Sequence, residues 1–131
     1  MSDNEKRSLK VMIIEDEEDI LFLYRDFLSN KGYNVVSCCL NADDVQMNIE
    51  TCEPDICLID YIIGGTGIGI DAGIQILKRK PSMPILFMTG YESIREELPK
   101  HPQLKNKNIQ ILMKPAKLSE IENALLQMVK V

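Results

Sequence analysis

Hydrophobic residues occur along the chain in short continuous runs that alternate with segments of helical periodicity. The apolar runs occupy residues 9–14, 34–40, 56–59, 85–88 and 109–113, and their polar exceptions are Lys10, Asn34, Ser37 and Gln110. In the segments between them, apolar residues recur three and four positions apart, as they do over residues 20–28 before Gly32. Short apolar runs of this length are typical of buried strands, and a spacing of three and four is typical of amphipathic helices. The pattern therefore predicts five strand–helix units.

Caps and breakers set the expected bounds of the helices. The second helix is expected to begin at an Asn41 cap and to end before Pro54, because proline cannot continue a helix. The third is expected over residues 71–79, behind a glycine-rich stretch at 64–69. The fourth is expected only over residues 92–98, since prolines follow at positions 99 and 102.

The last predicted helix has the clearest periodicity of the five. Its apolar face is expected to comprise Ile121, Ala124, Leu125, Met128 and Val129. Ser119 and Glu122 have the spacing of a capping box and are expected to start it.

Regular alternation of strands and helices specifies a parallel sheet with helices on both faces. The uninterrupted apolar runs at residues 56–59 and 85–88 are typical of central strands that are buried on both sides. The predicted fold class is therefore α/β, with a doubly wound sheet. In such sheets ligands bind at the carboxyl ends of the strands, so the residues that follow each strand are the candidates for function.

Composition limits the classes of function. The chain has 131 residues and a net charge of −5, which fits one folded domain at residues 9–131 after a polar tail at 1–8 and disfavours direct binding of nucleic acid. No apolar run reaches the roughly 20 residues that span a bilayer. Four cysteines without a CxxC spacing, and one histidine, do not make a zinc motif. Reduced thiols and a cytoplasmic location are expected.

Polar side chains follow four of the five predicted strands. Glu15 and Asp16 come after the first strand, Asp60 after the third, Thr89 after the fourth and Lys114 after the fifth. Each alone is an ordinary turn, cap or surface residue. Because parallel strands end at one edge, the three carboxylates are expected to lie together there, where they repel unless a cation joins them. Mg²⁺, which prefers oxygen ligands and often bridges carboxylates to phosphate, suits such a cluster.

These strand-end motifs resemble those of the receiver domains of two-component response regulators. The matching pieces are IED at 14–16, LID at 58–60, FMTG at 87–90 and MKP at 113–115, and the resemblance extends over nearly the whole chain. It implies a flavodoxin-like (βα)5 fold with the strand order 2-1-3-4-5. It also implies a signalling domain that is not an enzyme on other substrates.

The resemblance assigns a role to each strand-end residue. Asp60 would be the phosphoacceptor that takes a phosphoryl group from a phosphohistidine. Asp16, Asp60 and the backbone carbonyl of Ile62 would bind Mg²⁺ directly, and Glu15 would act mainly through water. Lys114 would pair with the phosphoryl group.

Thr89 would donate a hydrogen bond to the phosphoryl group. The implied partners are a sensor histidine kinase or a histidine phosphotransfer protein, together with a downstream protein or an output domain outside this sequence. Phosphorylation would change the surface that binds the downstream partner.

Three features depart from the family pattern. Ile111 stands where the family usually has an aromatic residue, so an aromatic rotamer switch is excluded at that position. The loop at residues 61–70 is longer and richer in glycine than usual. Pro99 and Pro102 predict an irregular fourth helix, in a region that the family uses for output.

Three other functions compete with this interpretation. The segment Gly67-Ile68-Gly69-Ile70-Asp71-Ala72 matches a dinucleotide-binding fingerprint, although it does not follow its strand closely. A phosphatase or phosphomutase would use Asp60 as a nucleophile, but Ile62 stands where such enzymes carry a second Asp. A receiver-like module that binds proteins without phosphorylation is the third alternative.

Overall fold

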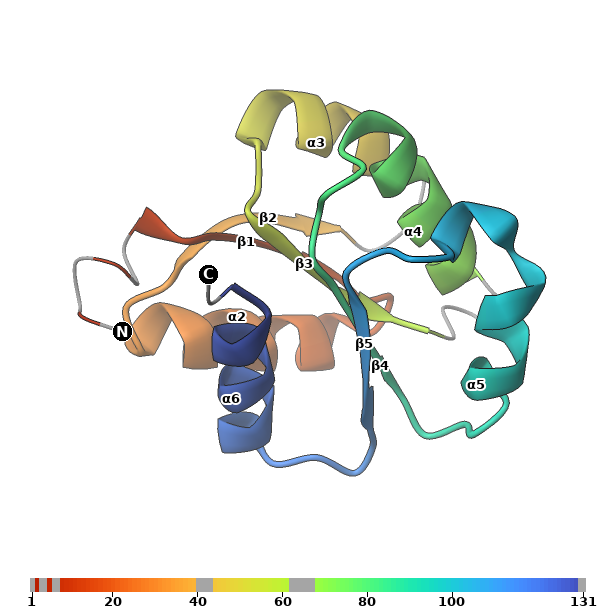
Figure 1. Cartoon of the computed structure of the whole chain (residues 1–131). Helices are drawn as coiled ribbons and strands as arrows, with labels where there is room; N and C mark the ends of the chain where they lie inside the picture. The colour runs from red at the N-terminus through yellow and green to blue at the C-terminus, as the bar shows by residue number, and fades with distance from the viewer. Residues whose placement is uncertain (1, 3–4, 6–7, 40–43, 62–67, 130–131) are drawn as a thin grey trace.

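The structure of the chain, a computed structural model, describes residues 2, 5, 8–39, 44–61 and 68–129 (Figure 1). Five strands form one parallel sheet in the order β2-β1-β3-β4-β5. This is the predicted doubly wound order. The strands are β1 (Lys10–Ile14), β2 (Asn34–Cys39), β3 (Ile56–Asp60), β4 (Ile85–Thr89) and β5 (Ile109–Met113).

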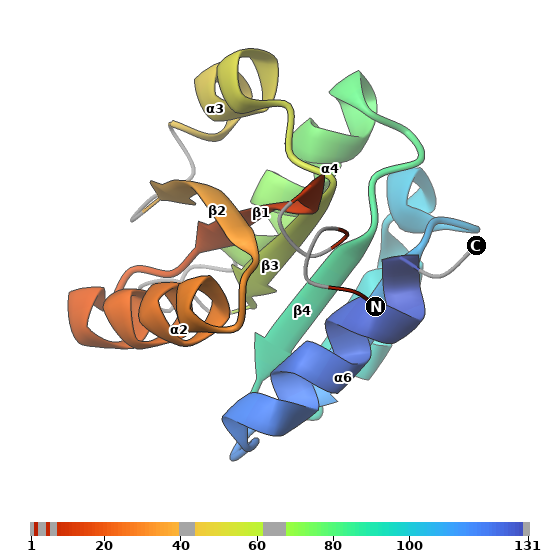
Figure 2. The ribbon, with the colours of Figure 1, turned by 90° about the vertical axis from the view of Figure 1, so that its left-hand side faces the viewer.

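Helices cover both faces of the sheet (Figures 1 and 2). On one face lie α2 (Glu18–Asn30) and α6 (Leu118–Val129), and on the other α3 (Val45–Cys52), α4 (Ile68–Arg79) and α5 (Ile94–Glu97). Two short 3₁₀ turns, η1 (Leu98–Lys100) and η2 (Pro102–Leu104), follow α5. None of the described helices is long and apolar enough to cross a membrane.

Alternation along each strand produces the two layers of the core. In β1, Met12 and Ile14 pack with α3 and α4, whereas Val11 and Ile13 pack with α2 and α6. Both faces of a central strand are thus apolar, which is why the predicted strands appear as continuous hydrophobic runs. All residues of β3 and β4 are buried, including the polar Asp60 and Thr89 at their ends.

The third and second predicted helices need correction at their starts. The helix expected over residues 71–79 begins three residues earlier, at Ile68, and ends at Arg79 as predicted. The helix expected from an Asn41 cap begins at Val45 and ends at Cys52, before Pro54. Asn41 itself lies outside the described residues.

The prolines shape the fourth helical segment, as the sequence predicted, but the α-helix is shorter than residues 92–98. It covers only Ile94–Glu97, and the chain continues in the turns η1 and η2, each with a proline in its first two positions. Proline lacks the N–H group that an α-helix uses for its i→i−4 bond. Two prolines three residues apart therefore leave only short 3₁₀ turns.

The predicted Ser119–Glu122 capping box is wrong. The last helix already begins at Leu118, and the carboxylate of Glu120 accepts a hydrogen bond from the backbone N–H of Lys117 at 3.0 Å. The glutamate contact that starts the helix therefore lies two residues earlier than the predicted pair. The predicted apolar face is confirmed, because Ile121, Leu125 and Met128 are all buried.

Candidate functional site

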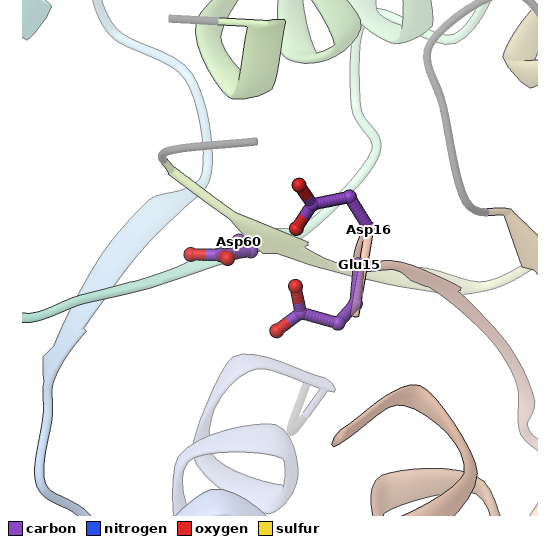
Figure 3. A group of neighbouring side chains, drawn as sticks. All are labelled: Glu15, Asp16 and Asp60. Atoms are coloured by element: carbon purple, nitrogen blue, oxygen red, sulfur yellow. The ribbon is translucent and has the colours of Figure 1, made fainter. Parts of the chain in front are cut away.

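Three carboxylates converge at the carboxyl edge of the sheet. Asp60 is the last residue of β3, and Glu15 and Asp16 directly follow β1, its hydrogen-bonded neighbour. The register pairs Ile14 with Ile59, so the next residues along the two strands are set side by side. One carboxylate oxygen from each of the three residues lies within 4.8 Å of the others. Figure 3 shows the side chains of Glu15 and Asp16 extending from the end of β1 toward the side where Asp60 lies at the end of β3.

Burial makes this cluster electrostatically costly. Glu15 is only 1% exposed and Asp60 8% exposed, whereas Asp16 is partly exposed. Burial of Glu15, then its hydrogen bond to Asp60 and the charge of Asp60, raise the pKa of the Glu15 carboxyl well above its usual range. Two like charges this close in a poorly solvated site repel, so a proton or a cation stabilises the cluster.

Lys114 supplies one positive charge to the cluster. Its Nζ atom lies 3.7 Å from Oε1 of Glu15 and 3.6 Å from Oδ1 of Asp60. The backbone N–H of Lys114 also donates a 2.7 Å hydrogen bond to the carbonyl oxygen of Thr89, which ties the end of β5 to the end of β4. Burial lowers the pKa of Lys114, but attraction to Asp60 and its other neighbours outweighs this and raises it.

Thr89 ends β4, between the strands that carry Asp60 and Lys114. It is 1% exposed, and its hydroxyl oxygen accepts a 3.0 Å hydrogen bond from the backbone N–H of Tyr91. This bond fixes the hydroxyl oxygen and leaves the hydroxyl proton available for donation. The structure thus brings the five predicted side chains to one sheet edge.

The donor set fits a hard divalent cation. All three acidic side chains offer oxygen, and Oε1 of Glu15 is buried without a hydrogen-bond partner. Mg²⁺ is bound through one or two carboxylates with water and phosphate completing its shell. The expected fourth contributor, the backbone carbonyl of Ile62, lies outside the described residues, as does Gly67 of the dinucleotide fingerprint.

Two residues matter here that the sequence did not single out. A Cβ atom on Gly69 would lie 2.5 Å from the carbonyl oxygens of both Asp60 and Tyr61, so only glycine lets the start of α4 approach the end of β3. The glycine-rich loop was visible in the sequence, but its pattern could not show which glycine makes this approach.

Tyr24 is the second such residue. It is buried on α2 and lines a hollow of about 500 Å³ with Lys114, Pro115 and Leu118. Its helical spacing identified it only as part of an apolar face, and no local signal indicated that this face borders the polar site.

Receiver domains of known structure share this fold. A receiver domain of the PhyR response regulator from Erythrobacter litoralis matches with a TM-score of 0.78 and 23% identity, over 93% of this chain and 90% of that one. A CheY-like receiver domain protein from Methanospirillum hungatei matches with a TM-score of 0.76 and 20% identity, over 91% of each chain.

Two curated relatives are longer proteins that match over part of their length. The alkaline phosphatase synthesis transcriptional regulatory protein PhoP of Bacillus subtilis is 28% identical over 81 residues, which are 62% of this chain and 33% of that protein. A protein-glutamate methylesterase/protein-glutamine glutaminase of Paramagnetospirillum magneticum is 28% identical over 86 residues, 65% of this chain and 24% of that protein. The matched region is thus a third or less of these relatives.

The sequence pattern of one domain family covers almost the entire fold. The model of the response regulator receiver domain matches residues 11–126, from the first strand into the last helix. This span includes four of the described strands completely, all of β1 except Lys10, and all five polar side chains at the sheet edge. The chain therefore belongs to the family of response regulator receiver domains, the signalling domains of two-component systems.

Proposed function

We propose that the chain accepts a phosphoryl group on Asp60 from a phosphohistidine, in a reaction that requires Mg²⁺. The observation that carries the proposal is the convergence of Glu15, Asp16 and Asp60 within 4.8 Å, with Lys114 beside two of them. A structural ion pair would need one acid for one base. Three acids around one lysine leave an excess negative charge that suits a metal ion and a transferring phosphoryl group.

In this proposal Asp16 and Asp60 hold the metal ion directly. Glu15, more deeply buried, acts mainly through water, and the carbonyl of Ile62 completes the protein ligands as the family resemblance implies. Bound Mg²⁺ would supply charge neutralisation for the phosphoryl oxygens. Oε1 of Glu15 supports this assignment, since it is buried without a hydrogen bond, which is costly, and its one charged contact, Nζ of Lys114, lies at 3.7 Å.

Asp60 is the proposed nucleophile. One of its carboxylate oxygens forms a bond to phosphorus as the phosphorus–nitrogen bond of the donor breaks, and the donor imidazole keeps the electron pair. The ammonium group of Lys114, 3.6 Å from Oδ1 of Asp60, is placed to pair with the transferred phosphoryl group. The Thr89 hydroxyl, whose oxygen already accepts a hydrogen bond from the backbone N–H of Tyr91, donates a hydrogen bond to a phosphoryl oxygen.

The donor reaches Asp60 from the open side of the sheet edge. A hollow of about 500 Å³ beside Lys114, lined in part by Ile20, Leu23 and Tyr24, offers an apolar surface for a sensor kinase or phosphotransfer protein.

The receiver domain is taken to cover residues 9–131 after a tail at 1–8, in a cytoplasmic setting where such donors act. Its output passes to a downstream protein or to a further domain, and this chain does not itself bind nucleic acid.

The first experiment is intact-mass spectrometry after incubation with acetyl phosphate and Mg²⁺. A gain of one phosphoryl group is expected, and it should be lost in Asp60→Asn and in the presence of EDTA. Asp71→Asn is the matched control, because Asp71 is an exposed aspartate on α4. Equal labelling of Asp60→Asn and wild type would contradict the assignment of Asp60.

A phosphorylation-independent binding module is the remaining alternative. It predicts no mass gain from acetyl phosphate or from phosphorylated histidine donors, even though the protein is folded. Labelling by a phosphohistidine donor alone would instead indicate a receiver restricted to its donor.

A further inference from the structure

Charge is distributed unevenly along the chain and along the sheet. Residues 1–71 contain 15 acidic and five basic side chains, whereas residues 72–119 contain three acidic and nine basic ones. The first part supplies β1 and β2 at one end of the sheet, and the second supplies β4 and β5 at the other. The domain therefore has a basic end despite its net charge of −5.

The basic excess is greatest after α5. Residues 98–119 carry five lysines and no acidic residue, and they form η1, η2, β5, the loop that leads to α6 and the first two residues of α6. Lys100 pairs with Glu97 at 3.1 Å. Lys105 is exposed and Lys107 half-buried, and neither forms an ion pair within the described part of the chain. Their charges are thus open to a partner.

An apolar hollow lies within this basic segment. Its volume is about 400 Å³, and it is lined by Leu98, Pro99, Leu104 and Lys105. Leu104 is 6% exposed and belongs to the core, while Pro99 and Lys105 are exposed. The hollow occurs where the prolines replace a regular helix by η1 and η2, which leaves less side-chain cover than a continuous helix would supply.

We propose that this hollow, together with Lys105 and Lys107, docks an acidic protein segment through an apolar anchor residue. Lys105 at the hollow and Lys107 two residues further along the chain would pair with carboxylates near the anchor, and the hollow would bury the anchor's side chain. An aliphatic or aromatic anchor fits three apolar lining residues, whereas a nucleic acid backbone offers none and would be repelled by the acidic end of the domain. This docking does not depend on phosphoryl transfer at Asp60.

The test is a titration of the unphosphorylated, ¹⁵N-labelled full chain, followed by amide chemical shifts. The probe is a synthetic peptide with one central leucine between three aspartates on each side. Its controls are the same peptide with serine in place of leucine, and a 12-base-pair DNA duplex. Saturable shifts at Leu98, Leu104 and Lys105 are expected, with a Kd below about 1 mM, and weaker shifts with the serine peptide.

Charge reversal then tests the lysines. Lys105→Glu combined with Lys107→Glu should raise the Kd of the leucine peptide by about tenfold or more. Lys31→Glu is the control, because Lys31 lies at the end of α2 near the opposite edge of the sheet, and it should change this Kd less than about twofold. The amide spectrum of each variant establishes that it is folded.

Four results would overturn the proposal: no saturable shifts, shifts centred elsewhere, equal binding of the serine peptide, or stronger binding of the duplex. Concentration-dependent sedimentation of the chain alone, abolished by the double reversal, would assign the surface to a second copy of the chain and would also overturn it. Because no phosphate or Mg²⁺ is used, these outcomes are separate from the outcome of the labelling experiment.

Discussion

The Nζ atom of Lys114 lies 3.6 Å from Oδ1 of Asp60, although their strands, β5 and β3, are not neighbours in the sheet. The intervening strand β4 contributes the carbonyl of Thr89, which accepts a 2.7 Å hydrogen bond from the backbone N–H of Lys114. This bond fixes where the lysine leaves β5, and the long side chain then reaches across the end of β4. The contact between the two residues therefore depends on the parallel order of three strands.

Removal of the Lys114 charge should slow phosphorylation. In Lys114→Ala, the initial rate of labelling by acetyl phosphate is expected to fall by about 10- to 100-fold, since an electrostatic contact worth about 1.4–2.7 kcal/mol in the transition state is lost. Lys117→Ala is the control, because Lys117 is exposed and forms no ion pair with Glu15 or Asp60. Mass spectrometry over time measures both rates, and equal rates would exclude a role for Lys114.

Repulsion within the acidic cluster should be measurable as stability. In EDTA above about pH 8, where Glu15 is ionised as well, Asp60→Asn is expected to raise Tm by about 3–6 °C, because one of three neighbouring negative charges is removed at a gain of about 1 kcal/mol. Saturating Mg²⁺ should stabilise the wild type and reduce this difference, since the metal ion offsets the same repulsion.

Differential scanning calorimetry with and without Mg²⁺ measures both effects of the Asp60 substitution. The control substitution Asp71→Asn, at an exposed position, should change Tm by less than about 2 °C in either buffer. A Tm for Asp60→Asn at or below that of the wild type in EDTA would contradict the repulsion.

Stability in EDTA should decline as the pH rises from about 5 to 8. Burial and Asp60 raise the pKa of Glu15 in the folded state, so the folded chain binds a proton in this range that the unfolded chain has lost. The stabilisation is complete below the ordinary carboxyl pKa and is lost as the pH passes the raised value. Glu15→Gln should flatten this dependence in a series of thermal unfolding curves; an unchanged slope would show that another group titrates.

Much of the fold was predictable because its signals are local. The continuous apolar runs located all five strands, and the bounds of β5 agree with residues 109–113. The strand ends then indicated the candidate site, since parallel strands bring their carboxyl ends to one edge. The order 2-1-3-4-5 came from the family resemblance, because periodicity does not specify which strands are neighbours.

What the sequence missed depends on contacts between distant segments. The helical periodicity of Tyr24 shows an apolar face, but only the packed structure places it beside Lys114. Ile111, which replaces the usual aromatic residue, is half-buried and packs against the core on the face of α4. The predicted helix starts were less accurate than the predicted strands, because they depend on tertiary contacts as well as on caps. The helix expected from residue 71, for example, begins at Ile68.

Gly69 and Gly90 provide a matched pair for the last prediction. A Cβ atom at Gly69 would lie 2.5 Å from two backbone carbonyl oxygens at the end of β3, whereas one at Gly90 would meet nothing within 4 Å. Gly69→Ala should therefore destabilise the fold by about 1–3 kcal/mol, since backbone atoms cannot move aside as a flexible side chain does. Gly90→Ala should change the free energy of unfolding by less than about 0.5 kcal/mol. Urea unfolding at equilibrium measures the free energy of unfolding of both variants. Because a Cβ atom at Gly69 would also displace the backbone of Asp60, Gly69→Ala should be phosphorylated more slowly by acetyl phosphate. Equal stability of the two alanine variants would mean that α4 can withdraw from β3 at little cost, and the approach at Gly69 would then not be what positions the loop beside Asp60.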